Sequence, residues 1–144
     1  MVETFEVNAV GPLRVQQALM PMMAKPGGKV VIISSGMGSI SDNGSGGIYA
    51  YRTSKAAVNM IAKCMSCDLK EDGIAVVSVN PGMVQTEFGP GPEGIKKMGG
   101  FTIEESVEGL VSVADMLTME MTGKFMTVSS NGKRCEPKEF PGGW

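Results

Sequence analysis

The chain has 144 residues, of which 42% are hydrophobic and 19% charged, and its formal net charge is −2. This length suits one domain around one modest core, so we expect residues 1–144 to form a single domain, and the small charge argues against nucleic acid or an anionic membrane as the main partner. Histidine is absent, which excludes Ser–His–Asp and Cys–His mechanisms and most zinc sites, and we propose no metal ligand.

The first half of the chain alternates between helix-like and strand-like segments. Residues 4–23 carry apolar side chains at helical spacing and end near Pro21. The apolar run 30–33 lies between turn residues and predicts a strand that is buried on both faces. Residues 48–71 have one regular apolar stripe and predict a second helix, and 74–79 predict a second buried strand.

The second half repeats this order after an irregular stretch. Residues 87–101 contain five glycines and two prolines, and we interpret them as a loop. Thr102 and Glu105 then form a capping-box pattern, which predicts a third helix that ends at Gly123. Residues 124–130 predict a third strand, and the tail from 132 to 144 looks irregular.

The order helix, strand, helix, strand, helix, strand predicts an α/β layer structure with a parallel sheet and right-handed crossovers. The run 30–33 has no charge, proline or bulge that would protect an open edge. It therefore needs a neighbouring strand that no other segment supplies. We expect part of the sheet to be missing on the N-terminal side or to be donated by another chain.

The strongest chemical pattern is formed by Ser35, Tyr51 and Lys55. Tyr51 and Lys55 lie four residues apart at the start of the second helix, so they share its sheet-facing side. An ammonium next to a phenol favours the phenolate, which makes a tyrosine a workable acid or base. Ser35 follows the first strand at the edge where open α/β sheets bind ligands, so its hydroxyl could position a substrate oxygen.

The stretch from Val30 to Asn59, VVIISSGMGSISDNGSGGIYAYRTSKAAVN, resembles the short-chain dehydrogenase/reductase family. The asparagine-bearing segment Val7–Pro12, the turn Asn80–Thr86 and the segment Gly123–Gly132 are similar to further parts of that family. The details of the sequence resemble most the carbonyl-reductase-like branch, which includes the bacterial C-factor proteins. The resemblance spans nearly the whole chain.

This resemblance implies roles for individual residues. Tyr51 would be the proton donor or acceptor, Lys55 would promote its ionisation and hold the nicotinamide ribose, and Ser35 would position the substrate carbonyl. Asn8 would help to hold a water molecule in a proton relay. The cofactor, NAD or NADP, would be contacted by Tyr51, Lys55, Pro81, Gly82, Val84 and Thr86.

Three other residues could compete for these roles. Ser34 precedes Ser35, but the family places its catalytic serine second in such a pair, and Ser39 is a weaker rival. Tyr49 has Thr53 four residues later and therefore lacks a lysine partner on its face of the helix.

The sequence also departs from the family. No Thr-Gly-x-x-x-Gly-x-Gly turn is present, and we interpret the spacing Gly89-x-Gly91-x-x-Gly94 as chance because prolines interrupt it. We therefore expect a partial Rossmann-like, doubly wound parallel sheet that comprises the family's C-terminal strands and helices and lacks the N-terminal dinucleotide-binding strands. In the family's layout, residues 87–101 would be the substrate flap.

Two cysteines, Cys64 and Cys67, lie inside the second helix on the side opposite to its core stripe. Too few further ligands exist for a metal, and a redox pair belongs at a helix start, so we assign them a structural role. The resemblance implies a homo-oligomer contact through this side of the helix, which carries Ala56, Met60, Cys64 and Cys67.

The resulting hypothesis is an NAD(P)-dependent oxidoreductase that reduces a carbonyl or oxidises a secondary alcohol. The alternatives are a truncated, inactive fragment or pseudoenzyme that acts through protein contacts, and one half of a two-chain enzyme. We expect a cytoplasmic protein without a membrane segment. The three cysteines cannot all pair, MVETFEVNAV shows no signal-peptide pattern, and no long apolar run is present.

Overall fold

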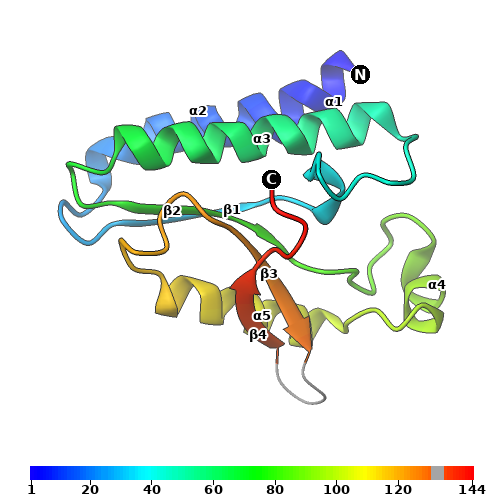
Figure 1. The fold of residues 1–144 in the computed structure, drawn as a ribbon. Coiled ribbons are helices and arrows are strands. Elements are labelled where there is room, and N and C mark those ends of the chain that lie inside the picture. Colours follow the sequence, from blue (N-terminus) through cyan, green and yellow to red (C-terminus); the bar gives the residue numbers. More distant parts are fainter. Residues whose placement is uncertain (131–134) are drawn as a thin grey trace.

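A computed structural model of the chain describes residues 1–130 and 135–144. Up to β2 its helices and strands alternate as the sequence predicts, whereas the second half has two successive helices and then two successive strands (Figure 1). In chain order the elements are α1 (Val2–Phe5), η1 (Glu6–Val10), α2 (Gly11–Leu19), η2 (Met20–Met22), β1 (Lys29–Ile33), η3 (Gly36–Gly38), α3 (Tyr49–Asp68), β2 (Ala75–Asn80), α4 (Gly91–Lys97), α5 (Ile103–Met116), β3 (Phe125–Ser130) and β4 (Cys135–Glu139).

The sheet has the strand order β1-β2-β3-β4. Strands β1, β2 and β3 are parallel, and β4 pairs with β3 in the antiparallel direction. Figure 1 shows three layers, with α1, α2 and α3 on one face of the sheet and α5 on the other. The predicted α/β class and its parallel core are confirmed.

The core lies on both faces of the sheet because successive strand residues point to opposite sides. On the α3 face, Val30, Ile32 and Val76 pack with Val58 and Ala62. On the α5 face, the cluster comprises Ala75, Val77, Val79, Val113, Leu117 and Met126. Burial of one such valine or leucine side chain contributes about 1.5–3 kcal/mol, so β2, which is buried on both faces, anchors the fold.

The first predicted helix is interrupted. Residues Glu6–Val10 form a π-helical turn, and Pro12 then stands in the first turn of α2. The helical segment ends at Met22, one residue short of the predicted end, after a 3-10 turn that contains Pro21. A π-turn inserts an extra residue into the helix, and such turns are frequent at functional sites; here it contains Asn8.

Three predictions for the second half were wrong. The segment interpreted as a loop contains α4, and the third helix ends at Met116 instead of Gly123. The ammonium of Lys29 donates to the carbonyls of Ala114 and Asp115 at 2.9 and 2.8 Å, which occupies the last acceptors of α5. Leu117 then leaves the helix in an extended conformation and is buried.

The third error concerns the tail, which forms β4 instead of an irregular segment. Phe140 and Trp144 stack on Phe125 with ring centroids at 4.6 and 5.6 Å. Offset stacking of aromatic rings contributes about 0.5–1.5 kcal/mol per pair beyond their buried area. This cluster therefore holds the end of the chain against the α3 face.

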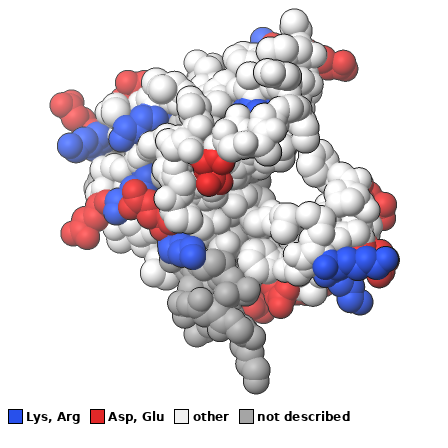
Figure 2. All heavy atoms as spheres, turned by 45° about the vertical axis from the view of Figure 1, so that its right-hand side comes forward, with Lys and Arg blue, Asp and Glu red and all other residues white. Residues whose placement is uncertain are grey.

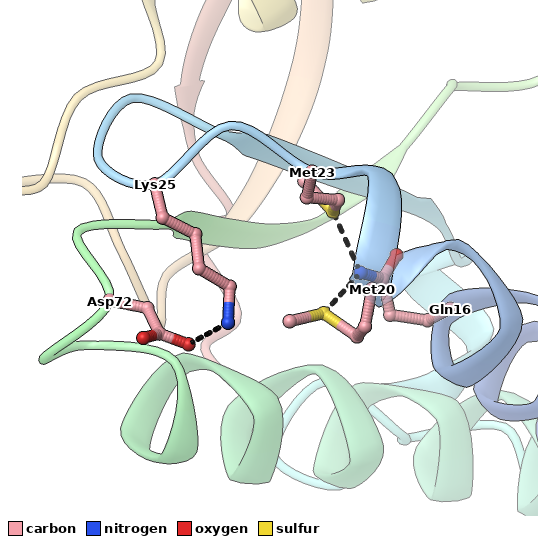
Figure 3. A network of polar contacts seen from close by, with 5 residues as sticks. All are labelled: Gln16, Met20, Met23, Lys25 and Asp72. Atoms are coloured by element: carbon pink, nitrogen blue, oxygen red, sulfur yellow. Dashed lines mark hydrogen bonds and ion pairs between the residues drawn. The ribbon is translucent and has the colours of Figure 1, made fainter.

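The amino ends of β1 and β2 are tied together by polar contacts (Figure 3). Lys25 and Asp72 form an ion pair at 2.7 Å between the loops that precede these two strands. Nearby, the amide nitrogen of Gln16 donates to the sulfur atoms of Met20 and Met23 at 3.1 and 3.0 Å. The carboxyl ends of the same strands lie at the opposite edge of the sheet.

In the part of the chain that the structure describes, no helix is both long and apolar enough to cross a membrane.

Candidate active site

Segments that follow β1 and β2 lie side by side, because these strands pair in parallel over five residues. The first segment contains Ser35 and η3, and the second contains the turn Pro81–Gly82. Both leave the sheet at its carboxyl edge, where open α/β sheets bind ligands. The N-terminal part of α3 passes over this edge and adds Tyr51 and Lys55.

The structure brings Tyr51 and Lys55 together on one side of α3. The Lys55 nitrogen lies 5.7 Å from the centroid of the Tyr51 ring. It also donates to the carbonyl oxygen of Ile33, the last residue of β1, at 3.2 Å. This bond holds the ammonium at the sheet edge, so its charge lies close to the tyrosine.

Burial lowers the pKa of Lys55 below its ordinary value, because removal from water penalises the charged form. The Ile33 carbonyl is its one hydrogen-bond partner among the described residues. An ammonium has three N–H donors, so two of them remain available for hydroxyl groups of a ligand.

Ser35 differs from its two rivals in accessibility. Its side chain is partly exposed and accepts a hydrogen bond from the Met37 amide at 3.2 Å. Ser34 is 2% exposed and Ser39 is 3% exposed, which removes both hydroxyls from contact with a substrate. The choice of Ser35 stays a prediction, but burial disfavours the other two.

Asn8 contacts α3 through Ser54, a residue for which the sequence predicts no role. Its amide nitrogen donates to the Ser54 hydroxyl at 3.1 Å, and Ser54 in turn donates to the carbonyl oxygen of Tyr51 at 2.8 Å. Ser54 is completely buried. A serine on the core side of a helix directly before Lys55 was the signal that could have identified it, because a buried hydroxyl requires a partner.

The turn after β2 is shaped by a glycine. Gly82 has a positive φ of 82°, and a Cβ atom there would collide with the Phe101 ring. The Pro81 carbonyl accepts a hydrogen bond from the Ser106 hydroxyl at 2.9 Å, which ties the turn to α5. The backbone of this turn is therefore fixed, and the Phe101 ring packs directly against it where Gly82 lacks a side chain.

Val84 and Thr86 follow in the same segment. Val84 pairs with Phe101 in an isolated β-bridge, and the Thr86 hydroxyl accepts from the Phe88 amide at 3.4 Å. The Phe88 ring, which is 66% exposed, lies 5.4 Å from the Tyr51 ring. This contact brings the two segments of the candidate site together.

Figure 2 shows the molecule hollowed between the lobe that carries α4 and the main body, with mostly uncharged residues around the hollow. The hydrogen bonds of the described residues do not include a direct one between Ser35 and Tyr51. Within residues 1–130 and 135–144, no group of three or more His, Cys, Asp and Glu residues could hold a metal ion.

Among the described residues, the hydrogen bonds and aromatic pairs do not connect the side chains of the other predicted residues to Ser35, Tyr51 or Lys55. Tyr49 is 74% exposed, and its ring belongs to no aromatic pair among the described residues. Cys64 and Cys67 are free and exposed on the outer side of α3, and Met60 on that side is 63% exposed. Among the described residues, Trp144 and Ile40 line a pocket with Ala56 and Met60 at one end of this side, whereas Cys64 and Cys67 stay exposed at the other end.

Comparison with known proteins agrees with this geometry. The family model described as short chain dehydrogenase matches residues 1–91. C-signal of Myxococcus xanthus is 42% identical over 126 residues, which are 87% of this chain and 72% of that protein. The 1-hydroxy-2-glutathionyl-2-methyl-3-butene dehydrogenase of Rhodococcus sp. (strain AD45) is 42% identical over 120 residues, which are 83% of this chain and 52% of that protein.

Among solved structures, carbonyl reductase Sniffer of D. melanogaster superposes with a TM-score of 0.76 at 31% identity, over 88% of this chain and 54% of that chain. The NADPH-bound carbonyl reductase from chicken fatty liver gives a TM-score of 0.73 at 34% identity, over 88% and 54% of the two chains. Apart from C-signal, the chain spans about half the length of these relatives. The chain belongs to the short-chain dehydrogenase/reductase family.

Proposed function

We propose that this chain carries the catalytic part of an NAD(P)-dependent oxidoreductase that reduces a carbonyl or oxidises a secondary alcohol. The observation that carries the proposal is the position of the Lys55 ammonium, which is bound to the end of β1 and lies 5.7 Å from the Tyr51 ring. No other tyrosine of the chain has a lysine one turn later. The pair lies at the edge where the fold binds ligands.

In this proposal, the Tyr51 hydroxyl donates its proton to the carbonyl oxygen during reduction and takes it back during alcohol oxidation. The charge of Lys55 stabilises the negative charge that develops on the phenol oxygen. The Ser35 hydroxyl donates a hydrogen bond to the same substrate oxygen and fixes its direction. Asn8 supports the helix beneath Tyr51 through Ser54.

The residues present fit the nicotinamide half of the cofactor. Two free N–H donors of Lys55 suit the ribose hydroxyls, and the turn Pro81–Gly82, held by Phe101 and Ser106, gives the second wall of the site a fixed position. Val84 and Thr86 extend this surface along the next segment. The hydride for the carbonyl carbon comes from the reduced nicotinamide when that cofactor is bound.

The test joins this chain to the N-terminal half of a family member, so that both halves of the cofactor find a site. Tyr51→Phe then lowers the reduction rate of aldehydes and quinones by at least about 10²-fold, since general acid–base groups contribute roughly 10²–10⁴-fold. Cofactor affinity, measured separately by fluorescence, stays largely intact.

Tyr49→Phe is the matched control and keeps most of the rate, because Tyr49 is exposed and lacks a lysine partner. If Tyr49→Phe is inactive while Tyr51→Phe retains its rate, the site is assigned to the wrong tyrosine.

A second candidate function is protein contact without turnover, and the free edge of β1 favours it. Within the described sheet this strand has a neighbour on one side only, and its last residue, Ile33, is 47% exposed. Edge strands of this kind pair with other chains. A chain that stays monomeric, with a sharp and reversible thermal transition, contradicts this candidate.

Pairing of two copies through the outer side of α3 is a separate proposal. Met60, Cys64 and Cys67 leave an apolar, sulfur-rich strip exposed there. Cys67→Glu would place a charge in such a contact and shift an oligomer toward monomer. An oligomer whose elution volume is unchanged by this substitution rules the contact out.

A further inference from the structure

Arg52 follows Tyr51 in the first turns of α3. The proposed reaction gives it no role, and its side chain bonds to the loop that precedes the helix. The guanidinium donates from all three nitrogens: to the Gly46 carbonyl at 3.1 Å, to the Met37 carbonyl at 3.4 Å and to the Ser45 hydroxyl at 2.8 Å. One side chain thus binds both ends of the loop that connects η3 with α3 (Figure 1).

The position of Arg52 near the start of α3 does not stabilise the helix. The amino end of a helix carries partial positive charge, which disfavours a cation in the first turns. The first turn of α3 contains no acidic residue, and the N-terminal cap residue, Ile48, supplies no side-chain hydrogen bond. The three loop acceptors therefore account for the position of this guanidinium.

The loop that Arg52 binds has an unusual backbone. Gly46, Gly47 and Ile48 are three successive residues with positive φ, of 63°, 67° and 46°. This conformation is unfavourable for a residue with a Cβ atom. Ile48 is β-branched and 64% exposed, so burial of its side chain does not offset this strain. Arg52 encloses the turn, because its amide bonds to the Ile48 carbonyl at 3.0 Å while its Nε bonds to Gly46.

The bond to Met37 extends this connection to the candidate serine. Met37 accepts from Arg52 through its carbonyl, and its amide donates to the Ser35 hydroxyl at 3.2 Å. Arg52 is therefore linked to the Ser35 segment through one residue and to Tyr51 by the helix itself.

We propose that Arg52 is a positioning residue that fixes the Ser35 segment and the left-handed turn Gly46–Ile48 against the start of α3, and so sets the position of Tyr51 relative to Ser35. This inference rests on the proposed function for its catalytic meaning. The planar guanidinium is required, because its fork of donors reaches acceptors that a single lysine ammonium cannot serve together.

The test uses the chain by itself and compares wild type, Arg52→Lys, Arg52→Ala and the control Arg14→Ala. Arg14 is an exposed arginine on α2 that pairs with Glu6 and is remote from the loop in the chain. Circular dichroism first establishes that each variant keeps its helical signal. If Arg52→Ala does not fold, Arg52→Lys decides the outcome.

Hydrogen exchange measured by mass spectrometry is the first readout. We expect amides in residues 37–48 to exchange at least about 10-fold faster in Arg52→Ala, the effect of losing about 1.4 kcal/mol of local stability. Arg52→Lys falls in between, and Arg14→Ala matches wild type. Ethylguanidinium at about 20 mM slows the exchange again in Arg52→Ala but not in wild type. Exchange within twofold of wild type in Arg52→Ala and Arg52→Lys overturns the proposal.

Acetylation of tyrosine by N-acetylimidazole is the second readout, because Tyr49 and Tyr51 are the only tyrosines of the chain. Tyr49 is already 74% exposed and serves as the internal reference. We expect the ratio of Tyr51 to Tyr49 modification to rise at least threefold in Arg52→Ala, and an unchanged ratio contradicts the positioning role. Neither readout needs turnover, so retained activity in Tyr51→Phe refutes the proposed function without affecting this result.

Discussion

The two sides of the candidate site are built in different ways. The β1 side presents side chains, since Ser35, Tyr51 and Lys55 offer hydroxyl and ammonium groups that α3 and β1 hold in place. The β2 side presents a turn of backbone, whose conformation depends on the missing side chain of Gly82. Substitutions of these three residues should therefore remove chemistry while the fold remains, whereas substitution of Gly82 should first damage the fold.

Lys55→Met tests the β1 side and carries the largest expected effect. In the chain joined to an N-terminal half, we expect loss of carbonyl reduction by at least about 10²-fold. Affinity for nicotinamide mononucleotide falls by roughly 10–100-fold, since hydrogen bonds to a charged group contribute about 1.5–3 kcal/mol. Rate and affinity are measured separately, and loss of only one of them shows that Lys55 has a single role.

Gly82→Ala tests the β2 side. The positive φ costs alanine roughly 1–2 kcal/mol, and the collision with Phe101 adds about 1–3 kcal/mol. Gly89→Ala is the matched control, because Gly89 also has a positive φ but has open space around it. Urea unfolding should show the larger loss for Gly82→Ala, and equal losses would mean that Phe101 moves aside without cost.

The pH dependence of stability tests the burial of Lys55. Burial lowers the pKa of Lys55 in the folded chain, so between that lowered pKa and the ordinary lysine value of about 10.5 the unfolded chain binds more protons. The free energy of unfolding therefore gains a favourable contribution as pH rises through this window. We expect the rise, measured by urea unfolding, to be absent in Lys55→Met and present in Lys97→Met, whose lysine is exposed on α4. If the free energy of unfolding depends on pH in the same way in wild type and Lys55→Met, burial does not lower the pKa of Lys55.

Phe88→Ala has the smallest expected effect on stability. Its ring is 66% exposed, so we expect a change below about 0.5 kcal/mol in the free energy of unfolding. Because the ring lies against Tyr51, the substitution should instead change the KM for aromatic carbonyls. A large loss of stability would show that the contact of the two rings holds the sides of the site together.

Local patterns were sufficient for the central elements. The run Val30–Ile33 and the stripe on α3 predicted their elements to within a few residues, because β-branched runs and 3.6-residue periodicity are properties of the segments themselves. The same periodicity placed Tyr51 and Lys55 on one side of the helix, and the structure has them together.

Elements that depend on distant partners were not predictable in this way. The end of α5 is decided by Lys29, which is 85 residues away from Ala114 in the sequence. The tail becomes ordered around Phe125 through Phe140 and Trp144. Neither contact leaves a local pattern, so the periodicity of the third helix was extended too far and the tail was interpreted as irregular.

The candidate site divides along the same line. The sequence alone determined which residue types can act, because the absence of histidine leaves Tyr51 with Lys55 as the best acid–base pair. Only the tertiary structure decided that Ser34 and Ser39 are buried while Ser35 is accessible. It also decided that Asn8 is connected to the Tyr51 carbonyl through Ser54. The same holds for the hydrogen bonds of Arg52 to the loop between η3 and α3. The physical reason is that chemical character belongs to a side chain, whereas exposure and hydrogen-bond partners depend on segments that become neighbours only when the sheet and its helices pack.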